Sequence, residues 1–247
     1  MPQRRTPHAQ NVMVPSAFET RSFAQTAVGL LREMILSGGY GPGERLNELA
    51  ISEQLQISRS PIREALQTLA GQGLVHFIPG RGAFVTDFDI DSIRELGELR
   101  IALESRAARL AASRATIAQL NEIRLILTHS EKAIRSGEID DLLDYSDRTI
   151  QSGGDYPQKL DFHQAVLNAS HNQRLVDAAD TAATQFRLAR ARTGREAAWA
   201  AEAHEEHRVI VEALERHDPE TADVAMEEHL ANSVSRSIAH IEATSGT

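Results

Sequence analysis

The sequence predicts a mainly α-helical protein in two parts, a small domain of three helices with a β-hairpin and then an all-helical bundle. Apolar residues recur at helical spacing over most of the chain, which indicates amphipathic helices. A strand-like pattern around a Pro-Gly-Arg-Gly turn occurs at 75–86. Beyond Asp89, Ala, Leu, Arg and Glu dominate and no convincing strand follows. We therefore expect a disordered basic tail at 1–17, a first domain at 18–87 and a helical domain at 88–247.

The first domain is expected to begin with an amphipathic helix over 18–37, followed by a short helix over 47–55. The apolar face of the longer helix consists of Ala24, Ala27, Val28, Leu31, Ile35 and Leu36. Between the two helices, the run GGYGPGERL at 38–46 favours turns because it is rich in glycine and contains proline. The tight turn QIS at 56–58 then leads into a third helix.

The third helix is expected over 60–72, because Ser60 followed by Pro61 is typical of an N-cap and a first helical position. Gly73 ends this helix, and VHFIPGRGAFVT at 75–86 predicts two short strands joined by a turn. Three helices followed by a β-hairpin are the layout of a winged helix-turn-helix domain. Such a domain places one helix in the major groove of DNA.

Two arginines, Arg59 and Arg63, stand at the start of the third helix, where positive charge opposes the helix dipole. Helix stability alone would favour Asp or Glu there, so an anionic partner is indicated. The whole chain has a formal charge of −9, yet residues 1–87 carry eight arginines, no lysine and a net charge of +1. Since only the surface that meets the phosphates must be basic, this composition permits DNA binding by the first domain.

The N-terminal end of a recognition helix contacts base edges, and the arginine side chain can donate two hydrogen bonds to guanine. We therefore expect Arg59 and Arg63 to read bases. Further DNA contacts are expected from Ser58, Ser60, Gln67, Arg45 at a phosphate, and Gly80, Arg81 and Gly82 at the tip of the hairpin. Any one of these arginines alone would also fit a solvated position at the protein surface. Their combination with the turn and the hairpin tip favours DNA binding.

The run GERLNELAISEQLQISRSPIREALQTLAGQGLVHFIPGRGAFV resembles the N-terminal domain of the GntR family of bacterial transcription regulators. Its most specific parts are PGERLNE, SRSPIREAL and GRGAFV, and the resemblance covers about residues 20–87. Gln56 departs from it, because the family often has glycine in this turn. The resemblance implies a homodimer that reads a short pseudo-palindromic operator in double-stranded DNA. It places Arg45, Arg59, Arg63 and the Gly80–Gly82 tip at that DNA.

The second part of the chain is expected to be a compact helical bundle without an internal repeat. Its helices are expected near 91–112, 116–136, 138–150, 156–170, 172–194, 197–217 and 219–241. His163, His207 and His229 lie on three different predicted helices, each with an apolar face that would turn inward. Imidazoles that converge inside a bundle can bind Zn²⁺, Ni²⁺ or Mn²⁺. The sequence does not show whether they converge, and each histidine alone would also fit an ordinary polar position.

The segments ELRIALESRAARLAA, DFHQAVLNASHNQRL, EEHRVIVEAL and MEEHL are similar to the FCD effector domain of the FadR subfamily. Many members of that subfamily hold a metal with three histidines and an Asp or Asn four residues before the first of them. His163, His207 and His229 match the three histidines, but Lys159 stands at the fourth position. Either Lys159 takes the place of the cation and pairs with an anionic effector, or a shifted helix start brings Asp155 or Asp161 to the metal.

The resemblance also implies an effector pocket at Arg100 and the three histidines, with Arg187 as a weaker candidate. Lys159, which departs from the family, is expected to add a positive charge to this pocket. Arg100 is matched by an arginine that points into the pocket of some relatives, where it would clamp a carboxylate. The alternative for Arg100 is an ion pair with Glu104, four residues along the same helix.

These patterns predict a ligand-responsive transcription regulator, a repressor without catalytic activity, that binds a small organic acid in its helical domain. The alternative is a zinc-dependent hydrolase in which three histidines leave one coordination position open. Against that alternative, no Asp or Glu general base stands out near the histidines. A constitutive architectural DNA binder is the third reading, and it leaves the large acidic helical domain unexplained.

The chain contains no cysteine, which excludes disulfides, thiolate metal ligands and cysteine nucleophiles. No run approaches the roughly 18 apolar residues of a membrane span, and MPQRRTPHAQ lacks the apolar core of a secretory signal. We therefore expect a cytoplasmic protein that does not contact a membrane.

Overall fold

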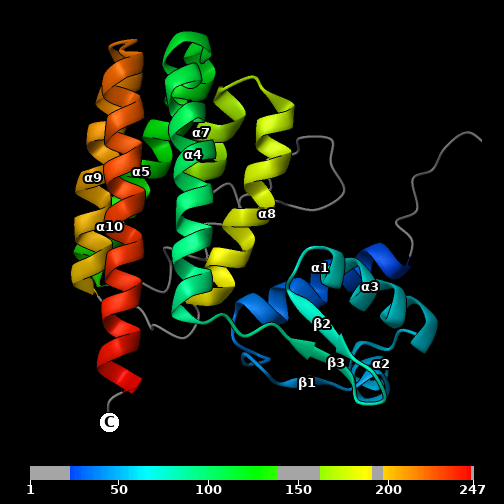
Figure 1. Ribbon diagram of the computed structural model, residues 1–247. Helices are drawn as coiled ribbons and strands as arrows, with labels where there is room; N and C mark the ends of the chain where they lie inside the picture. Colours follow the sequence, from blue (N-terminus) through cyan, green and yellow to red (C-terminus); the bar gives the residue numbers. More distant parts are fainter. Residues whose placement is uncertain (1–22, 138–161, 191–196, 246–247) are drawn as a thin grey trace, which may run out of the picture.

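The computed structural model describes residues 23–137, 162–190 and 197–245, and these form two domains joined between β3 and α4 (Figure 1). The N-terminal domain has the expected three helices and wing. Its elements are α1 (Phe23–Leu36), β1 (Arg45–Leu46), α2 (Glu48–Leu55), α3 (Arg59–Gly71), β2 (Val75–Ile78) and β3 (Gly82–Val85). The mainly α-helical class and the winged helix-turn-helix are confirmed.

The wing is a three-stranded antiparallel sheet in the order β1-β3-β2, one strand more than the hairpin predicted from the sequence. Arg45 pairs with Phe84 in this sheet. A strand of two residues is too short to show an alternating pattern, which is why the sequence did not reveal β1. At the tip, the Arg81 N–H donates to the Ile78 carbonyl at 2.9 Å, and Gly80 takes the positive φ of 74° that a type II turn requires.

The turn between α2 and α3 places Gln56 in the left-handed region, with φ 54°, which explains why glycine suits this position. Helix α3 begins at Arg59 with Ser58 as its N-cap, so the expected cap at Ser60 was wrong. Pro61 is the third helical residue, a position where the missing N–H costs nothing because the first four N–H groups have no partner within the helix. Arg59 and Arg63 therefore lie one turn apart on the same exposed side of α3.

The helical domain is built around two long neighbouring helices, α4 and α10, which run side by side (Figure 1). Its elements are α4 (Ile90–Arg114), α5 (Ile117–Ser136), α7 (Phe162–Ala169), α8 (Gln173–Arg190), α9 (Ala197–Glu215) and α10 (Pro219–Ser245). Gly97 permits the close approach, because a Cβ there would lie 2.3 Å from Cγ2 of Val234. None of the helices in the described ranges is long and apolar enough to cross a membrane. The helix expected over 138–150 lies outside the described residues.

Helix α8 connects the two domains. Leu188, near its C-terminal end, is fully buried and belongs to the same hydrophobic core as Leu31, Leu66 and Leu69 of the N-terminal domain. One turn earlier, the Gln185 side-chain amide donates to the Gln72 carbonyl at 2.8 Å. The N-terminal domain therefore shares part of its hydrophobic core with the helical domain.

Candidate DNA interface and candidate metal centre

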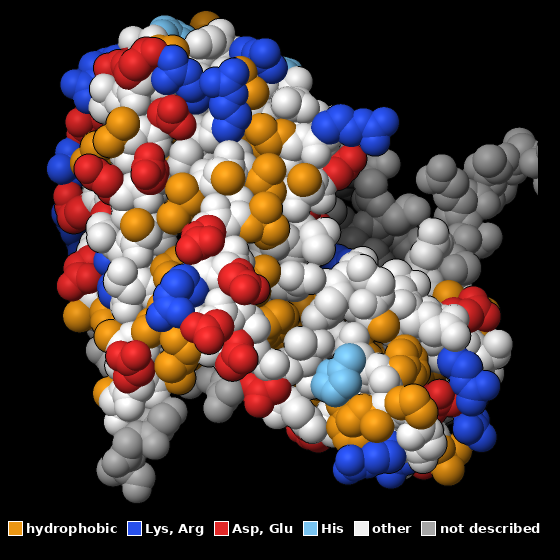
Figure 2. All heavy atoms as spheres, in the orientation of Figure 1, with side chains coloured by type: hydrophobic (Ala, Val, Ile, Leu, Met, Phe, Trp, Pro, Cys, Tyr) orange, Lys and Arg blue, Asp and Glu red, His pale blue; other side chains and the backbone are white. Residues whose placement is uncertain are grey.

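The N-terminal end of α3 presents Arg59 and Arg63 to solvent, and both contact one carboxylate, that of Glu48. Arg63 donates through Nη2 to Oε2 at 2.8 Å and through Nε to Oε1 at 3.2 Å, while Nη2 of Arg59 lies 3.6 Å from Oε2. The hydrogen bond from Arg63 holds the pKa of Glu48 below its usual value. Figure 2 shows basic side chains gathered at the edge of the N-terminal domain away from the bundle.

The wing carries the other expected DNA contacts. Arg45 is exposed on β1, and the Arg81 guanidinium lies over the Phe84 ring at 5.6 Å. Gly80 and Gly82, on either side of Arg81, both have positive φ. Ser58, Ser60 and Gln67 are exposed on or beside α3. The expected contacts are thus accessible on α3 and on the wing, and Glu48 is the member of this surface that the sequence analysis missed.

The three histidines converge inside the helical domain. His163 comes from α7, His207 from α9 and His229 from α10, and one ring nitrogen from each lies within 4.8 Å of the others. Nε2 of His229 is 3.1 Å from Nε2 of His207 and 3.3 Å from Nε2 of His163. Phe162 stacks on the His207 ring with 3.9 Å between centroids. The side chains that the sequence could only place on separate helices therefore meet at one point.

Two carboxylates stand behind this cluster, although no Asp or Glu general base stood out near the histidines in the sequence. Nδ1 of His229 lies 2.6 Å from Oε2 of Glu206. Nδ1 of His163 lies 2.8 Å from Oε2 of Glu104, at an angle that departs from a hydrogen bond. A carboxylate on Nδ1 favours the tautomer that keeps a lone pair on Nε2. In that tautomer Nε2 of His229, which faces Nε2 of His207 and of His163, keeps a lone pair that can bind a divalent cation.

The protonation states of the two carboxylates and of two of the histidines also suit metal binding. Burial would raise the pKa of Glu104, but the charge of Arg100 and the contact with His163 hold it at about 2. Burial would also raise the pKa of Glu206. Hydrogen bonds from His229 and Arg236 lower this pKa instead, to about 2. Burial lowers the pKa of His229 to about 4 and that of His207 well below its usual value. At neutral pH these two imidazoles are uncharged, the form that binds metals.

Arg100 forms the ion pair that the sequence analysis gave as the alternative. Its Nε and Nη2 donate to Glu104 at 2.6 and 3.2 Å, and its guanidinium lies over the Phe186 ring at 4.7 Å. Arg187 is exposed on α8, so the structure does not bring it to the buried cluster. Lys159 lies outside the described residues, as do Asp155 and Asp161.

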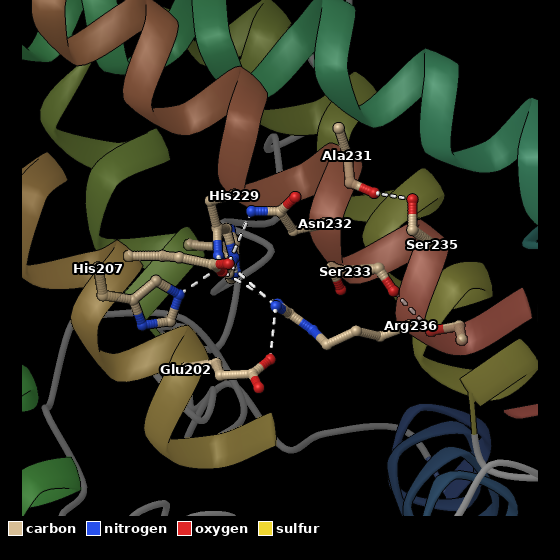
Figure 3. Close-up of polar contacts among 11 residues, drawn as sticks. Glu202, His207, His229, Ala231, Asn232, Ser233, Ser235 and Arg236 are labelled. Carbon is tan, nitrogen blue, oxygen red and sulfur yellow. Dashed lines mark hydrogen bonds and ion pairs between the residues drawn. The ribbon is translucent and has the colours of Figure 1, made fainter. Parts of the chain in front are cut away.

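Arg236 contacts Glu206, the carboxylate behind His229, and the sequence did not predict this contact. It reaches from α10 to Glu206 at 2.9 and 3.0 Å and to Glu202 at 3.3 Å (Figure 3). A shallow groove between α9 and α10 runs over these side chains. The groove-facing acids Glu202 and Glu206 are already neutralised in part by Arg236.

Comparison with known proteins assigns both domains. Residues 23–85 match the model of bacterial regulatory proteins of the gntR family, and residues 95–232 match the FCD domain. Over 159 residues the chain is 33% identical to the Nta operon transcriptional regulator of Aminobacter aminovorans, covering 64% of this chain and 68% of that protein. Over 222 residues it is 27% identical to the HTH-type transcriptional repressor RspR of Escherichia coli K12, covering 90% and 91%.

The solved structure of McbR/YncC from E. coli has the same fold. The TM-score is 0.70 at 22% identity, and the match covers 87% of this chain and 96% of that one. The two relatives named above are regulators by their names, and nothing in these comparisons supports the zinc-hydrolase alternative.

Proposed function

The chain belongs to the GntR family of bacterial regulatory proteins and carries an FCD domain, and on this basis we propose that it is a metal-dependent repressor controlled by a small organic acid. The family makes it a DNA-binding transcription regulator. The observation that carries the proposal further is the convergence of three imidazole Nε2 atoms, two of them backed by carboxylates, in the FCD domain. We propose that Arg59 and Arg63 read the operator and that the acid binds at this cluster.

His163, His207 and His229 would hold a divalent cation such as Zn²⁺, Ni²⁺ or Mn²⁺, with Glu104 and Glu206 orienting two of the rings. A bound cation supplies positive charge and an open coordination position for the carboxylate of an effector. The competing arrangement is that Lys159 pairs with the effector directly and no metal is needed. Elemental analysis separates these two arrangements.

Protein purified without chelator is expected to contain about one divalent ion per chain, and His229→Ala to contain almost none, since three ligands are the usual minimum for a protein site. Added Zn²⁺ should raise the thermal midpoint of chelator-treated wild type, because a ligand that binds only the folded state stabilises it. His76→Ala, which removes an exposed histidine of the wing, is the control and should behave as wild type. A wild-type protein that binds no metal would favour the Lys159 arrangement.

A contiguous set of contacts joins the cluster to the DNA-binding domain. His163 contacts Glu104, Glu104 pairs with Arg100, and Arg100 lies on Phe186 of α8. On the same helix, Gln185 and Leu188 contact the N-terminal domain. We propose that effector binding shifts α8 through Arg100 and Phe186, since allostery requires an element that both sites bias.

Phe186→Leu is expected to uncouple the two sites. A panel of sugar acids, dicarboxylates and aromatic acids, screened by thermal shift, would first identify a binding acid. That acid should weaken operator binding by wild type by about 5- to 150-fold. In Phe186→Leu the weakening should shrink towards none, while the affinity for the acid alone stays within about threefold. If the variant responds as strongly as wild type, the route through α8 is wrong.

The proposal includes a homodimer, because a pseudo-palindromic operator is read by two copies related by a two-fold axis. Exposed apolar side chains on the two long helices, among them Leu99 and Val224, are consistent with a surface that a second copy covers. Figure 2 shows hydrophobic side chains on the face of the bundle that α4 and α10 form in Figure 1. Light scattering of the purified chain measures the oligomeric state, and a monomer at micromolar concentration would contradict this part of the proposal.

A further inference from the structure

Glu48 is an acid inside the surface that we propose for DNA recognition. It is the first residue of α2, so the helix dipole favours a carboxylate there. The dipole does not explain the direction of the side chain, which turns to α3 and contacts two residues 11 and 15 positions later in the chain. A negative charge at this place repels the phosphates that the domain has to approach.

Stability does not account for the contact either. The side chains of Arg59 and Arg63 are 59% and 57% exposed, and ion pairs between exposed groups contribute little to folding. The geometry has a more specific effect on Arg63. Its Nε–Nη2 edge is taken by the two oxygens of Glu48, which do not occupy the Nη1–Nη2 edge. That edge has the two parallel donors that match O6 and N7 of guanine.

We propose that Glu48 is a positioning residue that determines sequence specificity, because it fixes the guanidinium of Arg63 for base contact and restrains Arg59 and Arg63 from binding phosphates non-specifically. This inference rests on the proposed role of the two arginines in base readout. One carboxylate between two guanidiniums leaves a single net positive charge at the tip of the helix. Without the carboxylate, both arginines are free to reorient towards the nearest phosphate of any sequence.

The test is Glu48→Gln, which keeps the size of the side chain and removes its charge. Glu53→Gln is the matched control, because Glu53 is exposed on the same helix and its removal changes the net charge equally. Wild type would first select duplexes from a library with a random core of about 20 base pairs, enough for two half-sites. The dissociation constants of the three proteins would then be measured for the selected duplex and for a scrambled one, between about 50 and 200 mM salt.

In Glu48→Gln, the affinity for the scrambled duplex is expected to rise several-fold and its salt dependence to steepen by about one unit of log K per log salt, because an additional phosphate contact forms. The affinity for the selected duplex should change less. The ratio of the dissociation constants for the scrambled and the selected duplex should therefore fall by about tenfold. Glu53→Gln should keep the wild-type ratio and salt slope. Thermal unfolding of all three proteins shows whether the fold is unchanged.

The outcomes separate this inference from the proposed function. If Glu48→Gln keeps the wild-type ratio and salt slope, or matches Glu53→Gln, the positioning role is refuted while DNA reading by the arginines stands. If Glu48→Gln loses affinity equally for both duplexes, the carboxylate supports the fold of the helix and not specificity. If wild type enriches no duplex at all, sequence-specific binding itself fails, and the inference falls with it.

Discussion

Replacing Arg59 and Arg63 together by alanine is expected to abolish selective operator binding. A well-placed bidentate arginine contributes about 1–3 kcal/mol of discrimination between bases. Two such residues contribute about 2–6 kcal/mol, which corresponds to a loss of roughly 30-fold to 10⁴-fold in affinity for the correct sequence. The fold should remain, because both side chains are exposed and their partner Glu48 stays 22% exposed to water. Fluorescence anisotropy with a duplex selected by wild type measures the effect.

The control for this double variant is Arg208→Ala on α9 combined with Arg216→Ala in the turn after it. These two arginines are exposed, and both pair with Glu212 of α9. Removing them changes the net charge by the same amount in the domain that does not meet DNA. Operator affinity should then change by less than about threefold at physiological salt, where charges farther than about 8 Å are screened. Equal losses in the two double variants would show that net charge, and not base readout, governs binding.

Glu104→Gln is expected to lower the free energy of unfolding by about 3–5 kcal/mol, because it leaves the guanidinium of Arg100 buried without its counter-charge. Arg100 is 6% exposed and Glu104 1% exposed, so water cannot replace the lost partner. Urea unfolding in chelator-containing buffer measures this loss without a contribution from bound metal. The combined replacement Arg100→Met and Glu104→Leu should recover much of the stability, since an apolar pair needs no counter-charge.

The control is Glu131→Gln, which breaks the pair with Arg135 at the same four-residue spacing on the surface of α5. It should cost less than about 1 kcal/mol, as exposed pairs do. If Glu104→Gln lowers the free energy of unfolding by no more than Glu131→Gln does, the ion pair of Arg100 and Glu104 contributes little to stability.

The same carboxylate gives a pH dependence. The pKa of Glu104 is about 2 in the folded protein and higher when the chain is unfolded, so its stabilising contribution is complete above about pH 4.5 and is lost as the pH falls towards 2. The difference in unfolding free energy between wild type and Glu104→Gln should therefore shrink over this window. A difference that stays constant down to pH 2 would contradict the depressed pKa.

The order and type of the elements could be predicted because they depend on local patterns. The glycine and proline of 38–46 ended α1 as expected, and the apolar positions of α3 placed Ile62, Leu66 and Leu69 in the core. The N-cap of α3 was placed two residues late, at Ser60 instead of Ser58. Proline is tolerated throughout the first turn of a helix and does not mark only its first position.

The partners of the site residues could not be predicted, because they come from distant parts of the chain. Glu104 and His163 are separated by 59 positions, and no periodicity within α4 shows that this acid faces α7. The contact of Glu48 with α3 depends likewise on the angle at which the turn at Gln56 joins two helices. The three histidines were found because their helices each had a recognisable apolar face, whereas these acids also fit ordinary solvated positions on their helices.

The buried position of Leu188 affects any attempt to study the N-terminal domain in isolation. A fragment that ends at residue 88 would retain α1, α3 and the wing but lack Leu188, which is buried in their hydrophobic core. Without α8 the apolar surface that Leu188 covers is exposed to water, which costs about 25 cal/mol per Å² and weighs on the stability of so small a unit. The excised fragment would unfold at a lower temperature than the same residues do within the intact chain. A rotation of α8 would change the packing of the N-terminal domain as well as its position.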